Sequence, residues 1–161
     1  MMQKGIIIIV IFLLSTFSFS MKKKRVCISL IKTYNVKHSE IKLVNKLLAS
    51  KIMRYNLFTI ADKRRYQRHI KILKMTENYR ERDLSPRKKA IEMAIWLNAR
   101  FLVWGKLIFH SKKYHLKIGI INTLTGKMFK SFSQIAKSPG DFSIIANHVS
   151  NSLYSHLRYS Y

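Results

Sequence analysis

Apolar residues recur along the chain with two different periods, and these periods predict strands and helices in turn. Runs of β-branched and apolar residues predict strands over 25–32 and 57–61. Between these runs, Ser39 is expected to cap a helix that carries Glu40 in its first turn. The apolar face of this helix, with spacings of three and four residues, consists of Ile41, Val44, Leu48, Ile52 and Tyr55.

Two more helices are predicted between residues 62 and 100. Asp62 can cap the first of them, whose apolar side is expected to face inward while its other side is basic. Ser85 can cap the second, because Pro86 then takes the first helical position. The polar stretch between the two helices, at 78–84, is expected to be a loop.

The last third of the chain predicts three strands and a closing helix. The strands are expected over 101–111, 114–122 and 128–135, and the short links between them imply antiparallel hairpins. Asp141 can cap the last helix. The apolar face of that helix consists of Phe142, Ile145, Ala146, Val149, Leu153 and Leu157.

The resulting order is β-α-β-α-α-β-β-β-α, which predicts a single domain of the α/β (α+β) class. The early β-α-β unit is expected to form a parallel, right-handed crossover. Because the later hairpins add antiparallel strands, the sheet should be mixed and packed by helices.

The first twenty residues have the order of a secretory signal sequence. Lys4 supplies a positive start, residues 5–14 are almost purely apolar, and Ser18 and Ser20 occupy the positions that precede a cleavage site. The apolar stretch is short for a membrane span, which needs roughly 20 residues. This pattern predicts a signal peptide over 1–20 and a domain over 21–161 that is exported to the periplasm or cell envelope.

Two alternatives to a cleaved signal peptide stay open. The basic run at 22–25 follows at once, and positive charges there favour the cytoplasmic side, so the segment could instead anchor the chain in the inner membrane. If Met21 is the true start, the protein is cytoplasmic. No cysteine ends the apolar segment, so a lipoprotein is not expected.

Charge is the most unusual feature of the composition. The chain has 31 Lys and Arg residues against 7 Asp and Glu, a net charge of +24. Such an excess predicts attraction to anionic partners, among them acidic proteins, acidic lipid headgroups, cell-wall polymers and nucleic acid. A codon bias that inflates Lys and Ile would also raise the charge without any function.

The predicted helix after Asp62 concentrates these charges. Opposite Tyr66, Ile70 and Leu73 it carries a set of cations that is predicted to bind anionic surfaces: Lys63, Arg64, Arg65, Arg68, Lys71 and Lys74. A solvated face and a nucleic-acid contact are the alternatives. Export and the lack of a zinc-finger or RNP motif argue against nucleic acid.

Alternation along the strand predicted at 101–111 separates two faces of the sheet. One face is uniformly apolar and is expected to lie against helices. The other mixes lysine with large apolar groups, and we expect a protein partner to bind it through Leu102, Trp104, Lys106 and Ile108. The alternative is that another helix covers this second face.

No motif for catalysis or cofactor binding occurs in the chain. It has no P-loop, no G-x-G-x-x-G, no nucleophile elbow and no H-E-x-x-H. If residues 112–113 form the hairpin turn, His110 faces His115, but two ligands are too few for structural zinc. The lone Cys27 is expected in the core. We therefore expect no enzyme, no cofactor and no metal site.

Three short motifs recur in order in a known family. They are FTIADK at 58–63, ARFLVWGKL at 99–107 and IINTLTG at 120–126. The pattern resembles the envelope domain shared by the TolB amino-terminal domain, the curli-secretion lipoprotein and the outer-membrane activators of penicillin-binding proteins. The resemblance spans roughly 25–157 and implies a non-enzymatic domain that works by protein contacts in the envelope. Lys63 stands where the family usually has arginine, and the chain lacks the long hairpins needed to build a pore.

Overall fold

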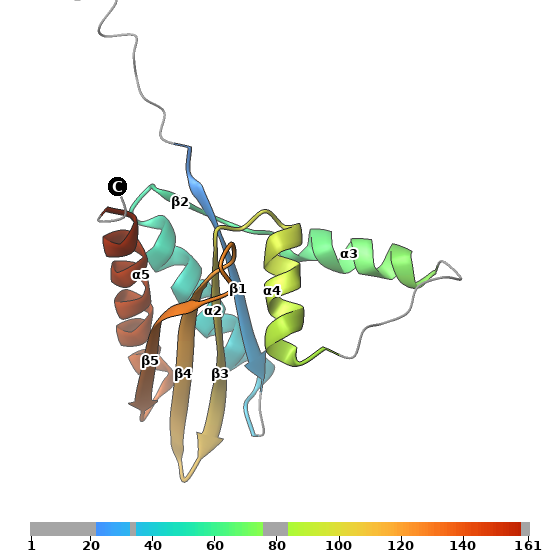
Figure 1. Ribbon diagram of the computed structural model, residues 1–161. Coiled ribbons are helices and arrows are strands. Elements are labelled where there is room, and N and C mark those ends of the chain that lie inside the picture. The colour runs from blue at the N-terminus through green and yellow to red at the C-terminus, as the bar shows by residue number, and fades with distance from the viewer. Residues whose placement is uncertain (1–21, 33–34, 76–83, 159–161) are drawn as a thin grey trace, which may run out of the picture.

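The computed structural model describes residues 22–32, 35–75 and 84–158, and it confirms the predicted order of elements (Figure 1). The predicted signal peptide and most of the predicted loop at 78–84 lie outside these residues. The elements are β1 (Lys24–Lys32), α2 (His38–Met53), β2 (Phe58–Ile60), α3 (Lys63–Lys74), α4 (Pro86–Trp96), β3 (Phe101–His110), β4 (Lys113–Asn122), β5 (Met128–Ala136), the 3-10 turn η1 (Pro139–Asp141) and α5 (Phe142–Arg158).

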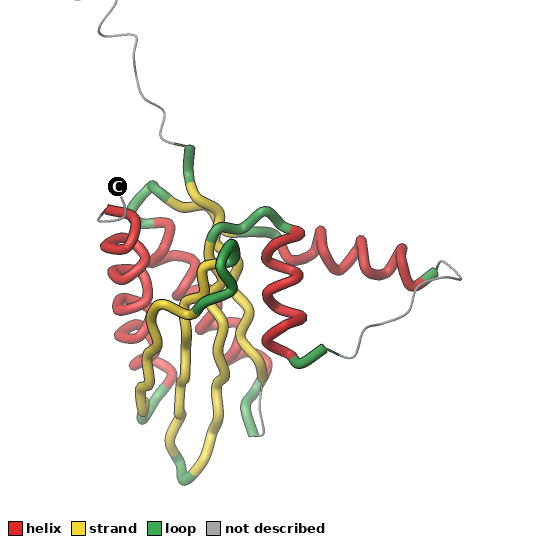
Figure 2. The backbone as a smooth tube through the Cα atoms, viewed as in Figure 1, coloured by secondary structure: helices red, strands yellow, loops and turns green. Residues whose placement is uncertain are grey.

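The five strands form one mixed sheet in the order β2-β1-β3-β4-β5 (Figure 2). The strand β1 is central to the topology, because it pairs in parallel with both β2 and β3. The strands β3, β4 and β5 then form an antiparallel meander. The predicted α+β class and mixed sheet are therefore confirmed.

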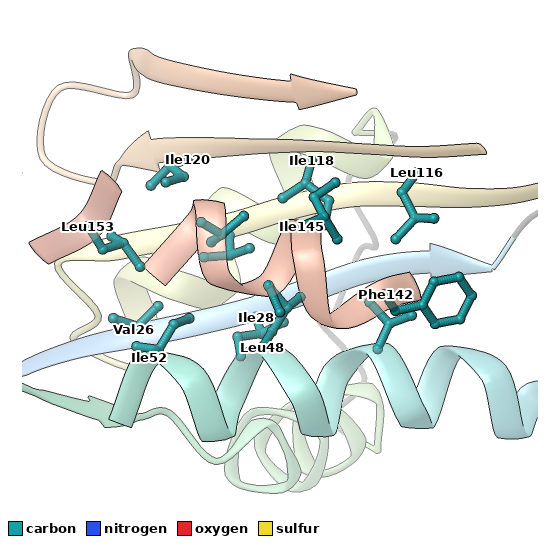
Figure 3. Close-up of a cluster of buried hydrophobic side chains, with 14 of the residues drawn as sticks. Val26, Ile28, Leu48, Ile52, Leu116, Ile118, Ile120, Phe142, Ile145 and Leu153 are labelled. Carbon is teal, nitrogen blue, oxygen red and sulfur yellow. The ribbon is translucent and has the colours of Figure 1, made fainter. Parts of the chain in front are cut away.

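The helices α2 and α5 cover one face of the sheet, which we call the inner face. Its main core joins the apolar faces of both helices to alternate residues of β1, β3 and β4 (Figure 3). The largest fully buried side chains of this core are Phe101, Phe142, Leu48, Ile52, Leu107, Leu116, Ile120, Ile145 and Leu153. The hydroxyl of Tyr114 on β4 donates to Glu40 on α2 across 2.5 Å, so a polar contact also joins sheet and helix.

A second, smaller core lies on the opposite, outer face, where α4 covers part of the sheet. Small residues on α4, Ala90 and Ala94, allow the helix to approach closely. Beneath them lie Cys27, Leu102 and Ile121, all fully buried. The helix α3 packs beside α4 and contributes no buried residue. The outer face is therefore sealed by α4 only at one end.

The residues of the recurring motifs have structural roles at the end of β4. The buried Thr123 hydroxyl donates to the carbonyl of Ala99 across 2.6 Å, which joins this turn to the start of β3. Gly126 has φ +65, a left-handed conformation that glycine adopts without strain. These two residues therefore fix the β4–β5 turn and hold it against the start of β3.

Three predicted details of helix caps and turns are wrong. The helix α2 begins at His38, before Ser39. The carboxylate of Asp141 accepts the N–H groups of Lys137 and Ser138 at 2.9 and 3.0 Å, so it closes the turn before α5 and does not cap α5.

The third detail is the β3–β4 turn, which is formed by residues 111 and 112. Both have positive φ, 51° and 60°, as a two-residue turn that follows the twist of the strands requires. His110 is therefore opposite Lys113, and His115 is opposite Ile108. The two histidines do not face each other.

Candidate functional site: the open part of the outer sheet face

Beyond the end covered by α4, the outer face of β3, β4 and β5 forms an open hollow of about 360 Å³. Its side chains point away from the inner core because they alternate with buried residues along each strand. The hollow is lined from β3 by Trp104 and Lys106, from β4 by Lys117 and Gly119, and from β5 by Met128, Ser131 and Ser133. We call this surface the open face.

Trp104 is the largest side chain of the open face. Its ring packs at the margin of the smaller core and is half-buried. The indole Nε1 is shielded from solvent and has no hydrogen-bond partner within the described residues. A buried donor without an acceptor is costly, roughly 1–3 kcal/mol. An acceptor that reached the indole N–H would therefore be stabilising, although the side chains that shield it would first have to move.

Gly119 lies directly opposite Trp104 on β4 and sets the depth of the hollow. A Cβ at this position would stand 2.5 Å from the Cε atom of Met128, so the methionine side chain already occupies the space above the glycine. Methionine has a flexible, unbranched side chain that adapts easily to its neighbours. The floor of the hollow can therefore rearrange without moving the backbone.

Two lysines face each other in the middle of the open face. Lys106 and Lys117 are directly paired across β3 and β4, and both are exposed. Like charges in directly opposed positions are destabilising. The sheet thus holds two cations together at a site where an anionic group would relieve their repulsion.

The four residues predicted to bind a partner separate into three environments. Trp104 and Lys106 line the hollow, and Ile108 lies beyond them, half-buried. Leu102 was wrongly included, because it is 0% exposed and lies under α4. A helix therefore covers this face at Leu102, whereas Trp104 is only partly covered and Lys106 is exposed.

The cations predicted on α3 share one helix, and all but one are exposed. Lys63 is half-buried, whereas Arg64, Arg65, Arg68, Lys71 and Lys74 are exposed. Asp62 caps the helix by accepting the N–H of Arg64 at 3.0 Å, and its carboxylate pairs with the Arg64 side chain at 3.1 Å. These hydrogen bonds hold the pKa of Asp62 below its usual value.

The part of the chain that the structure describes contains no group of three or more His, Cys, Asp or Glu side chains that could hold a metal ion. Burial raises the pKa of the Cys27 thiol to about 11, which makes it a poor nucleophile, although the nearby charge of Lys63 acts in the other direction. No helix within the described ranges has the length and apolar character to cross a membrane.

Lys117, Gly119 and Met128 line the hollow but are not among the four residues predicted to bind a partner. Alternation along the strand places Lys117 and Gly119 on the same face as Trp104, so the sequence does carry a signal for these two residues. Met128 could not be found in this way, because the β4–β5 pairing shifts at Ile120/Ile121 and brings Met128 opposite Ile121.

Comparison with known proteins identifies the fold. No protein-family model matches the chain, and no curated protein matches it significantly in sequence. The C-terminal domain of LpoB from Salmonella enterica is similar in structure, with a TM-score of 0.51 and 15% identity. The match covers 80% of this chain and 93% of that domain.

Two further structures give weaker likenesses. TolB from Acinetobacter baumannii has a TM-score of 0.49 and 8% identity over 84% of this chain and 28% of its own. Lipoprotein GNA1162 from Neisseria meningitidis has a TM-score of 0.47 and 10% identity, covering 84% and 97%. The resemblance predicted from the motifs is thus confirmed at the level of the fold, for which the LpoB domain supplies the argument.

Proposed function

We propose that this chain is a non-catalytic, envelope-associated module that binds a protein partner through the open face. The observation that carries the proposal is the indole N–H of Trp104, which is shielded and without an acceptor at the edge of a hollow. The signal-like first twenty residues and the fold shared with the envelope domains that the motifs resemble support the location.

The chemistry of the open face favours a partner that presents a carboxylate. An aspartate or glutamate placed over the hollow would lie near Lys106 and Lys117 and relieve their mutual repulsion. A backbone carbonyl or second carboxylate oxygen of the same partner would accept the Trp104 N–H once the side chains that shield this group move. Tryptophan is enriched among the residues that dominate binding energies, and the flexible Met128 would adapt to the contact.

Site-specific photo-crosslinking in cells tests the partner surface. A photoreactive residue at Ser133, which is exposed and lines the hollow, should yield a discrete adduct in the envelope fraction. The same residue at Lys42, exposed on α2 and away from the open face, should not yield that adduct. Identical adducts from both positions, or none from Ser133, would contradict the proposal.

Once the partner is identified from the adduct, single substitutions measure separately the contributions of the Trp104 N–H and of the Lys106 charge to binding. Trp104→Phe keeps an aromatic ring and removes only the N–H, so binding should fall by about tenfold. Trp96→Phe removes the chain's other indole N–H and should leave binding unchanged. Lys106→Glu should weaken binding further, because it places a negative charge where the partner's carboxylate would lie.

Cell fractionation with N-terminal sequencing tests the compartment separately. The expected product is an envelope protein whose chain begins near Met21. A product that retains residues 5–14 would favour the inner-membrane anchor. A soluble cytoplasmic chain that begins at Met21 would contradict the proposed location and favour the nucleic-acid-binding alternative.

A further inference from the structure

The helix α3 stands away from the body of the molecule (Figure 1). It contributes no fully buried residue to either core, and its Tyr66 packs, partly buried, against the smaller one. Its first half is held against α4 by Trp96, which stacks on His69 at 4.7 Å and meets Tyr66 edge-to-face at 5.7 Å. The second half, from Lys71 onward, extends beyond these ring contacts. This arrangement presents a whole helical face outward instead of burying it.

The outward face of α3 is strongly cationic. The helix itself contains no acidic residue, and Asp62 at its cap pairs with Arg64. Arg64, Arg68 and Lys71 lie one helical turn apart along a shallow concavity of about 640 Å³. Because like charges at these spacings repel, the helix is disfavoured in isolation and would be favoured beside a dense negative charge.

Two apolar side chains are exposed among these cations. Ile72 is 63% exposed and Met75, the C-cap residue, is 78% exposed. By helical spacing Ile72 follows Arg68 by one turn, and Met75 follows Lys71 by one turn. Exposed isoleucine and methionine would add nothing to the binding of a soluble polyanion, whereas a lipid interface accepts cationic and apolar groups together.

We propose that α3 docks the protein on an anionic lipid surface. Arg64, Arg68 and Lys71 pair with phosphate headgroups, and Ile72 and Met75 enter the boundary between headgroups and acyl chains. Cationic side chains reach the headgroup level while their aliphatic stems stay in the apolar region. This contact uses a different element from the open face, so either surface can be present without the other.

Binding of the full chain to two kinds of vesicle tests the proposal. One kind is phosphatidylcholine and the other is phosphatidylcholine mixed with phosphatidylglycerol. Because the apolar residues 5–14 would enter either membrane, the measured quantity is the ratio of the two partition coefficients. The wild-type chain should prefer the anionic vesicles, and this preference should fall steeply as salt rises above about 0.1 M.

Two charge-reversal variants with the same net charge supply the matched comparison. The α3 variant carries Arg64→Glu, Arg68→Glu and Lys71→Glu, and the ratio should fall by at least about a hundredfold. The control carries Lys42→Glu, Lys46→Glu and Arg54→Glu on exposed positions at and around α2, and its ratio should stay within about threefold of the wild type. Equal losses in both variants would mean attraction by net charge and would overturn the proposal.

A third variant separates a lipid from a soluble polyanion. Ile72→Ser with Met75→Ser keeps every charge and should lower binding to anionic vesicles by about tenfold, while binding to polyglutamate stays unchanged. Circular dichroism verifies that each variant is folded. If the third variant binds anionic vesicles as tightly as the wild type, the helix is a polyanion site and the lipid proposal is wrong.

Discussion

The inner and outer faces of the β3–β4 hairpin are made from alternate residues of the same two strands, yet they are used differently. On the inner face, α2 and α5 cover the hairpin, and Phe101, Leu107, Leu116 and Ile120 are fully buried. On the outer face, α4 covers one end, and the remainder carries Trp104, two opposed lysines and a hollow. Alternation decides which residues share a face, and the length of the covering helices decides which part of it remains available for binding.

The largest expected effect is the loss of an inner-face aromatic. Phe101→Ala should lower the free energy of unfolding by about 3–5 kcal/mol, because it leaves a cavity between the sheet and α5. Trp104→Ala, three residues along the same strand, should cost about 2 kcal/mol or less, since its ring is already partly in solvent. Chemical denaturation followed by circular dichroism measures both. Equal losses would mean that the open face belongs to the core.

Alanine substitutions at two glycines compare the inner and outer faces in a second way. A Cβ at Gly105 would overlap the carbonyl oxygen of Lys117 and stand 2.9 Å from the Cα of Ile118. Gly105→Ala should therefore cost about 3 kcal/mol, because backbone atoms must move.

Gly119→Ala is the matched change, since Gly119 lies on the partner strand and faces the hollow. It meets only the end of the Met128 side chain, and should cost about 1 kcal/mol or less. Chemical denaturation measures both losses, because variants with the same m-value can be compared directly by their denaturation midpoints. A larger loss at Gly119 than at Gly105 would contradict the difference drawn between the faces.

The titration of Cys27, which is buried under α4, shows whether water reaches the smaller core. Burial raises the pKa of its thiol to about 11, so the unfolded chain loses the proton first as pH rises. The associated stability is fully present below about pH 9 and is lost toward pH 11, by about 2 kcal/mol.

Other groups titrate in the same pH range, so the measurement is a difference. Unfolding free energies of the wild type and of Cys27→Ala are compared at each pH. The gap between them should shrink as pH rises from 9 to 11. A gap that is constant with pH would show that the thiol is hydrated in the folded protein.

The smallest expected effect is a gain in stability, whereas the changes above all lower it. Lys106→Glu replaces a directly opposed pair of like charges with an opposite-charge pair to Lys117. Stability should rise by roughly 0.2–1 kcal/mol at low salt, and the gain should shrink as salt is added. A thermal melt measures this change, and loss of the partner adduct in the same variant would indicate that the repulsion is retained for binding. Unchanged or lower stability would remove that interpretation.

Local signals in the sequence were sufficient for most of the fold. Asp62 and the Ser85-Pro86 pair locate the starts of α3 and α4. The first N–H groups of a helix have no partner within the helix. A capping side chain accepts a hydrogen bond from one of them, and proline lacks the N–H altogether. The β3–β4 turn was misplaced by one residue on each strand, because Ser111 and Lys112 adopt positive φ without glycine or asparagine to indicate it. The assignment of faces survived, because this error changes the pairing by two residues in total.

The sequence could not decide which outer-face residues stay accessible. Leu102 and Trp104 are alike in the alternation pattern, and only the position of α4 separates them. That helix packs through alanines, whose burial leaves a weak periodic signal, so its footprint on the sheet is a tertiary property. The contact between Met128 and Gly119 likewise depends on the irregular pairing of β4 with β5.

The placement of the two tryptophans gives the protein its own optical probes. The chain contains two of them: Trp104 at the open face, and Trp96 against the rings of α3. Trp96→Phe leaves fluorescence that responds to the hollow alone, and Trp104→Phe leaves fluorescence that responds to the base of α3. With these two variants, occupancy of either surface can be followed in real time by emission wavelength and quenching, without attaching any dye to the molecule.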